Sequence, residues 1–169
     1  MDIILPAFFI VMIIELMLSI SWNIVYFNFG IPIFIYEIPH NYVEIENKNS
    51  IEIQNLVESN AYNSLIFNQQ TNNSIAFREV LMSGESKLPS IPIMRGNIKY
   101  TERGKVKVTG YIYWSLILFF LLYISLLMNV KDEENIDILL VLFPMVIFWD
   151  FFRQKKKYIR IAEIAAGKS

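Results

Sequence analysis

Glu15 is the residue whose type and position most suggest chemistry in this sequence. It lies near the middle of the apolar run FFIVMIIELMLSISW, where an acidic side chain costs roughly 2.5 to 3.5 kcal/mol inside a bilayer. Ser19 and Asn23 follow at spacings of four and eight residues, so on one helix the three would line one face. Such a stripe predicts either an intramembrane proton or ion site or a hydrogen bond that fixes helix packing.

A buried carboxyl group needs partners, and a second apolar segment offers them. Judged by depth, we expect Tyr123 and Ser125 to lie beside Glu15, and Ser115 and Asp150 to lie level with Asn23. No GxxxG motif offers another packing device. The packing role is therefore the simpler interpretation of this acid.

Few other residues have the type and spacing that catalysis requires. The sequence has no cysteine and one histidine, His40, in a context typical of a solvated turn. Glu44, Glu46 and Glu52 could gather on one sheet face, although alternating acids usually mark the wet side of a strand. Because no metal, phosphate or nucleophile motif is present, we expect no enzyme activity, no cofactor and no metal.

Four basic residues directly follow the last apolar segment, namely Arg153, Lys155, Lys156 and Lys157. Such a cluster suits anionic lipid headgroups at about 1 kcal/mol per charge, so membrane lipids are an expected partner. The net charge of −1 argues against nucleic acid, and Tyr100 and Tyr111, the aromatic residues near the basic segment 99–107, are better explained by sheet packing and the interface.

Three apolar blocks predict the elements that position these residues. We expect transmembrane helices over residues 3–29, 110–129 and 136–152, with a short external turn over 130–135 and a basic tail over 153–169. Lysine and arginine number eight in residues 30–107 and six in the tail, against one in the turn. The positive-inside rule then places the chain in the cell membrane as a multi-pass protein, with the N-terminus outside and the C-terminus cytoplasmic.

Residues 30–109 predict a small β-rich cytoplasmic domain between the first two spans. Period-two patterns indicate strands over 32–38, 42–46, 74–80, 97–100 and 105–114. We also expect a short helix over 50–60, a polar loop over 68–74 and a hairpin turn over 102–104. The fold class is thus a membrane protein of α+β type, and PH-like and split-barrel architectures both remain open.

The leading functional hypothesis is a non-catalytic, membrane-anchored interaction protein or an accessory subunit of a membrane complex. Its β-rich domain would bind a protein partner, or the chain would form a homo-oligomer. The alternative is an oligomeric channel or transporter component in which Glu15 carries a proton or ion. The size also permits a pore former or an immunity protein.

Overall fold

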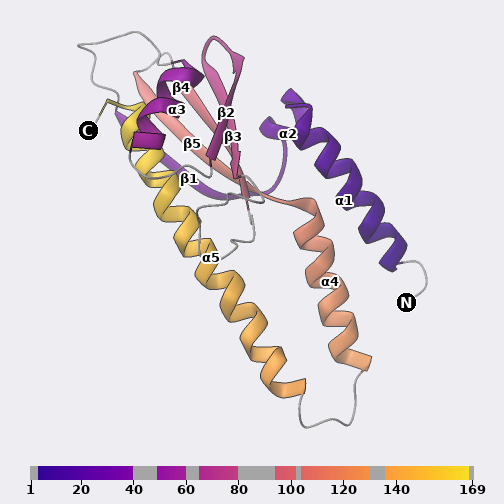
Figure 1. Ribbon diagram of the computed structural model, residues 1–169. Helices are drawn as coiled ribbons and strands as arrows, with labels where there is room; N and C mark the ends of the chain where they lie inside the picture. Colours follow the sequence, from indigo (N-terminus) through magenta and orange to yellow (C-terminus); the bar gives the residue numbers. More distant parts are fainter. Residues whose placement is uncertain are drawn as a thin grey trace.

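An antiparallel sheet lies at one end of the molecule, and three helical segments extend away from it on the same side (Figure 1). The computed structural model describes residues 4–39, 49–59, 65–79, 94–101, 104–129 and 136–167. Within these ranges the chain order is α1 (Ile4–Ile20), α2 (Ile24–Asn28), β1 (Pro32–Pro39), α3 (Ser50–Ser59), β2 (Leu65–Thr71), β3 (Ser74–Glu79), β4 (Met94–Thr101), β5 (Lys105–Ile112), α4 (Trp114–Asn129) and α5 (Ile136–Ala165).

The five strands form one open sheet in the order β1-β5-β4-β3-β2. Strands β2 to β5 pair with their neighbours in the chain, and β1 closes the other edge beside β5. The predicted hairpin is confirmed, because Thr101 pairs with Lys105 and Gly104 adopts a φ of 65° that favours glycine. The predicted helix over 50–60 is confirmed as α3, where Asn49 and Glu52 form a reciprocal capping box.

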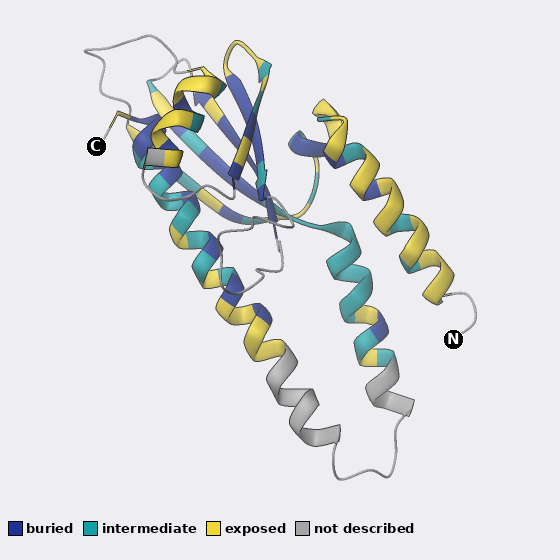
Figure 2. Cartoon of the chain, in the orientation of Figure 1, coloured by how far each residue is buried: buried dark blue, intermediate teal, exposed yellow. Residues whose placement is uncertain are grey.

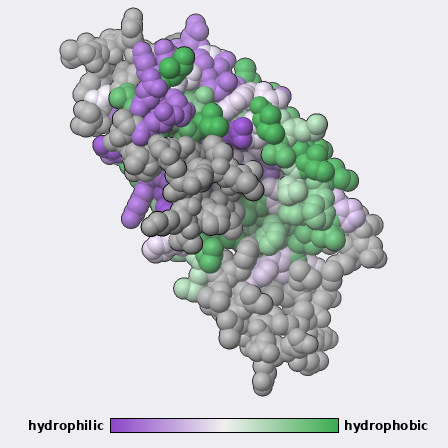
Figure 3. Space-filling view, in the orientation of Figure 1, coloured by the Kyte–Doolittle hydropathy of each residue, from purple (hydrophilic) through white to green (hydrophobic). Residues whose placement is uncertain are grey.

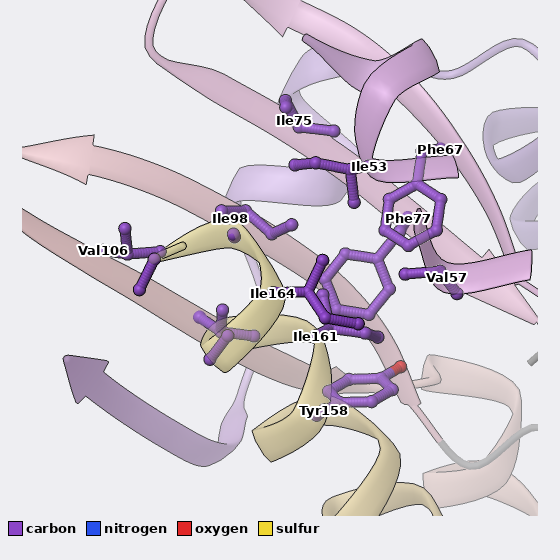
Figure 4. Packing of buried hydrophobic residues seen from close by; sticks show 14 of the residues in the cluster. Ile53, Val57, Phe67, Ile75, Phe77, Ile98, Val106, Tyr158, Ile161 and Ile164 are labelled. Carbon is purple, nitrogen blue, oxygen red and sulfur yellow. The ribbon is translucent and has the colours of Figure 1, made fainter. Parts of the chain in front are cut away.

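One face of the sheet packs against α3 and the C-terminal half of α5 (Figure 4). Alternate residues of the strands, such as Ile75, Phe77 and Ile98, point into this core and are buried. Tyr158 and Ile161 of α5 pack onto them from the other side. The opposite face is covered at one end by α2, whose Phe27 packs with Ala76 and Trp22 in a second small cluster.

The polar segment 68–74 is not the predicted loop, because β2 continues to Thr71 and β3 begins at Ser74. Leu65 and Phe67 anchor β2 in the core. Gln54 of α3 completes its outer edge, since its amide donates to the Leu65 carbonyl at 2.9 Å and accepts from the Phe67 N–H at 3.1 Å. Two buried residues and one side-chain bridge therefore hold a strand that is polar from Asn68 onward. The predicted strand over 42–46 lies outside the described residues.

The prediction of three transmembrane helices is wrong. Among the residues that the structure describes, no helix combines the length and the apolar character needed to cross a bilayer. Residues 3–29 do not form one helix: α1 ends at Ile20, and Trp22, with a φ of 53°, turns the chain into α2. The 17 residues of α1 extend about 26 Å, which is short of the roughly 30 Å hydrocarbon layer. The multi-pass cell-membrane localisation depended on those helices and is overturned by the same finding.

The third predicted span and the basic tail are parts of one element, because α5 runs without interruption from Ile136 through Pro144 to Ala165. Its second half buries Tyr158, Ile161, Ala162 and Ala165 at helical spacing against the sheet. The segment that begins with a basic cluster is therefore a core helix of the α+β unit.

Candidate functional site

Glu15 lies buried at the junction between α1, α2, β4 and α4. Its side chain is 4% exposed, and both of its carboxylate oxygens accept hydrogen bonds. Oε1 accepts from the Tyr26 hydroxyl at 2.8 Å and from the Trp114 N–H at 2.8 Å. Oε2 accepts from the N–H of Ser115 at 2.8 Å and from its hydroxyl at 2.6 Å. Backbone N–H groups can only donate, so this environment suits an ionised carboxylate.

The start of α4 explains why an acid is needed at this point. Helix α4 begins at Trp114, directly after β5, with Tyr113 at the position where Ser, Thr, Asp or Asn usually caps a helix. No acidic residue occupies its first turn. Glu15 reaches across from α1 and binds the first two N–H groups of α4, where a helix has free donors and a partial positive charge.

Arg95 is the counter-charge of Glu15, and it is fully buried. Its Nη1 lies 3.4 Å from Glu15 Oε1 and 3.0 Å from the carbonyl oxygen of Ile112. Its Nε and Nη2 donate at 3.0 Å to the carbonyls of Tyr26 and Phe29. One guanidinium therefore connects α1, α2 and β5 around a sheet residue.

Aromatic rings enclose this ion pair. The Arg95 guanidinium lies 3.7 Å from the centroid of the Tyr26 ring and 5.4 Å from that of Trp114. Burial raises the pKa of Tyr26 well above its usual value, although the charge of Arg95 opposes the shift. The Tyr26 hydroxyl therefore remains protonated and continues to donate to Glu15.

The structure divides the polar stripe that the sequence predicted. Glu15 and Ser19 lie on α1 and are buried, but Asn23 lies beyond the end of α1. Asn23 instead caps α2 by accepting from the Tyr26 N–H at 3.0 Å. Tyr123 and Ser125 lie on α4 about 12 and 15 Å along the helix from Ser115, which takes the place by Glu15 that we expected for them.

Sequence reasoning missed Arg95 and Ser115 for two reasons. The chain reverses at Trp22, so Glu15 lies level with the start of α4 and not with its middle. Arg95, Asn97 and Lys99 occupy every second position of β4. This pattern does not show which of the three is buried. The signal that could have pointed to these partners of Glu15 is the helix start at Trp114, which lacks a capping side chain of its own.

The predicted headgroup cluster separates into two kinds of residue. Lys157 forms an ion pair with the buried Glu79 of β3, and Arg153 pairs with Asp150 at 3.2 Å. Lys156 is exposed, and half-buried Lys155 lies 6.0 Å from the Phe34 ring centroid. Lys155 and Lys156 are thus the members that face outward on α5.

The remaining candidates for chemistry offer little. His40, Glu44 and Glu46 lie outside the described residues, and Glu52 caps α3. Within the described ranges no group of three or more His, Asp or Glu side chains is placed to hold a metal ion.

The most extensive unexplained feature is the outer surface of α1 (Figure 2). Nine large apolar side chains of this helix are each at least 41% exposed: Leu5, Phe9, Ile10, Met12, Ile13, Ile14, Leu16, Met17 and Ile20. At 100° per residue they cover an arc of about 200°. Figure 3 shows hydrophobic side chains gathered over the region of α1 and α4, and hydrophilic ones over the sheet end.

Helix α5 continues this pattern before it reaches the sheet. Met145, Val146, Phe148, Trp149 and Phe152 are exposed there, with Trp149 at 73%. We call the exposed side chains of α1 and these five residues of α5 the apolar helical surface. No family model, curated protein or solved structure matches this chain, so its function has to be inferred from the Glu15–Arg95 junction and the apolar helical surface themselves.

Proposed function

We propose that this chain is a non-catalytic interaction protein, and that its α+β unit holds the apolar helical surface for a binding partner. The observation that carries the proposal is the arc of about 200° on α1. A helix that packs on its own domain typically shows an apolar stripe of about 100°, and a helix apolar over most of its circumference is normally covered. Contiguous exposed apolar patches larger than a few hundred Å² are typical of interaction sites.

The sheet is less suited to this role than our sequence interpretation suggested. Gln54 occupies the edge of β2 at Leu65 and Phe67. Pro32 and Pro39 stand at the two ends of the other edge strand, β1. One face is filled by α3 and α5. The geometry therefore favours the helices as the binding surface and the sheet as their support.

The contacts of Glu15 favour the packing role over the proton or ion site. Both carboxylate oxygens are engaged by donors from α2, β4 and α4. Transport through this group would have to break the junction that holds α1 to α4. The interaction function needs the same contacts intact.

The proposal is tested with the full chain, purified in mild detergent and then transferred to detergent-free buffer. Light scattering coupled to size exclusion should show self-association or precipitation, because the apolar helical surface loses its cover. The double variant Ile13→Glu/Met17→Glu should shift the chain toward monomer, since these side chains are 53% and 66% exposed. Ile51→Glu on α3 is the matched control, because Ile51 is 70% exposed on another element and its replacement should change nothing. A wild-type chain that stays a monodisperse monomer without detergent would refute the proposal.

A further inference from the structure

We infer that the occupant of the apolar helical surface is a lipid surface with anionic headgroups, whose acyl chains cover the apolar side chains while Lys155 and Lys156 contact the headgroups. This inference rests on the proposed function and names its partner. It requires contact with lipid and no helix that crosses the layer.

The width of the arc on α1 is the first argument. A single partner helix or sheet covers one side of a helix, which corresponds to a stripe of about 100°. The exposed arc on α1 is about twice as wide. Acyl chains are mobile and can contact a helix from several sides at once, so they fit such an arc better than one rigid protein surface does.

The composition of that arc is the second argument. Every exposed residue described on α1 is apolar, and the one acid of the helix, Glu15, is turned inward onto Arg95. Protein interfaces usually surround an apolar centre with a polar rim that forms hydrogen bonds. Along α1 the exposed apolar side chains have no such polar rim. Their composition matches a hydrocarbon environment, in which the backbone N–H and C=O groups of a helix form their hydrogen bonds within the helix.

The position of the basic residues is the third argument. On α5 the exposed apolar residues end at Phe152, and Arg153, Lys155 and Lys156 follow immediately. Trp149 stands just before this change, as aromatic residues do near a headgroup layer. Along α5 the exposed apolar side chains therefore come first, with Trp149 near their end, and the basic side chains follow.

The fold places this change near the point where α4 leaves the sheet. Gln154 accepts from the Met94 N–H at 3.3 Å, which fixes the basic segment of α5 at the beginning of β4. Met94 pairs with Ile112 at the end of β5, just before α4 starts. Arg95 joins the same point to Glu15 on α1. The basic residues of α5 therefore lie near the start of α4, which Glu15 of α1 also contacts.

The test is flotation of the full chain with vesicles after detergent removal. Vesicles of phosphatidylcholine alone are compared with vesicles that also contain phosphatidylglycerol. Wild type should float with both, and more strongly with the anionic ones, with the difference decreasing as salt rises. Ile13→Glu/Met17→Glu should stop flotation with both compositions, whereas Ile51→Glu should not.

Lys155→Gln/Lys156→Gln should weaken binding to the anionic vesicles about 30-fold, from about 1 kcal/mol per charge, and leave binding to neutral vesicles unchanged. The control is Lys99→Gln/Lys105→Gln, which removes two exposed lysines toward the other end of the sheet. An equal loss in both pairs would overturn the assignment of Lys155 and Lys156 to the headgroups.

A second measurement reads wild type first, so it does not depend on the folding of the charge variants. Phospholipids brominated in the acyl chain should quench the tryptophan fluorescence of wild type, and Trp149→Phe should remove part of that quenching. Absence of flotation and of quenching would overturn the lipid assignment. If the chain then forms a defined oligomer that Ile13→Glu/Met17→Glu dissociates, the proposed function survives with a second copy as partner. If neither lipid nor assembly responds to that variant, the proposed function fails as well.

Discussion

Replacement of Glu15 by Gln should lower the free energy of unfolding by about 3 to 5 kcal/mol, the usual cost of breaking a buried ion pair on one side. The structure shows where that cost arises. Arg95 would remain fully buried without a counter-charge. The new amide nitrogen would also face a donor: at the Oε2 position it would meet the Ser115 N–H, now 2.8 Å away. An unpaired buried donor adds about 1 to 3 kcal/mol to such a change.

A double-mutant cycle isolates the interaction from the cost of each substitution. Arg95→Met should destabilise by a similar amount, because it leaves the carboxylate of Glu15 buried without its cation. The variant Glu15→Gln/Arg95→Met should lose clearly less than the sum of the two single variants, with a coupling of about 1 to 3 kcal/mol. The assay is denaturant unfolding of the full chain in one fixed buffer, followed by circular dichroism.

The matched control is the ion pair between Glu37 and Lys107, whose side chains are 46% and 39% exposed at a separation of 3.5 Å. Glu37→Gln should change the free energy of unfolding by less than about 1 kcal/mol, because solvent screens the pair. Additivity of the Glu15 and Arg95 substitutions within about 0.5 kcal/mol would refute the reasoning, since the two groups would then not act as one unit.

Three further predictions test the fold. Gly96→Ala should destabilise by about 1 to 3 kcal/mol, because its Cβ would stand 2.1 Å from the Phe77 ring, and Phe77→Leu should recover part of the loss. Gln54→Ala should cost about 1 to 2 kcal/mol and speed hydrogen exchange at the Phe67 amide, while unchanged exchange would count against the edge bridge. Burial raises the pKa of Tyr158 well above its usual value near 10, so folding favours the protonated form and stability should fall as the pH rises above about 10. Tyr158→Phe should flatten that fall in denaturant midpoints measured at rising pH, and an unchanged slope would contradict the assignment.

Elements whose signals are local were accessible from sequence. The alternation in residues 32–38 and 74–80 predicted β1 and β3, and the short helix expected over 50–60 is α3. Strand β2 was missed because it is polar from Asn68 onward, and its pairing with β3 and its contacts with α3 explain why it forms. The second half of α5 was misread because a basic cluster at its start concealed the apolar positions at helical spacing.

The candidate site shows the same limit more sharply. Glu15 was recognisable from sequence, because an acid in an apolar run must be compensated. Its partners were not, because Arg95 and Ser115 lie 80 and 100 residues away and depend on how the chain turns at Trp22. Hydropathy likewise showed the apolar blocks, but it could not show that the first one divides into α1 and α2.

The location of Glu15 also decides where a function should be sought. Helix α4 starts directly after β5 with Tyr113 at its capping position, and Arg95 is fully buried and forms its ion pair with Glu15. One carboxylate from α1 satisfies both, and in doing so it fixes two apolar helices at the same end of the sheet. The contacts of this carboxylate are therefore the ones that join α1 to α4 and to Arg95. Because Glu15 is turned inward, every exposed residue described on α1 is apolar, and this uncharged face is the surface that we propose for a partner.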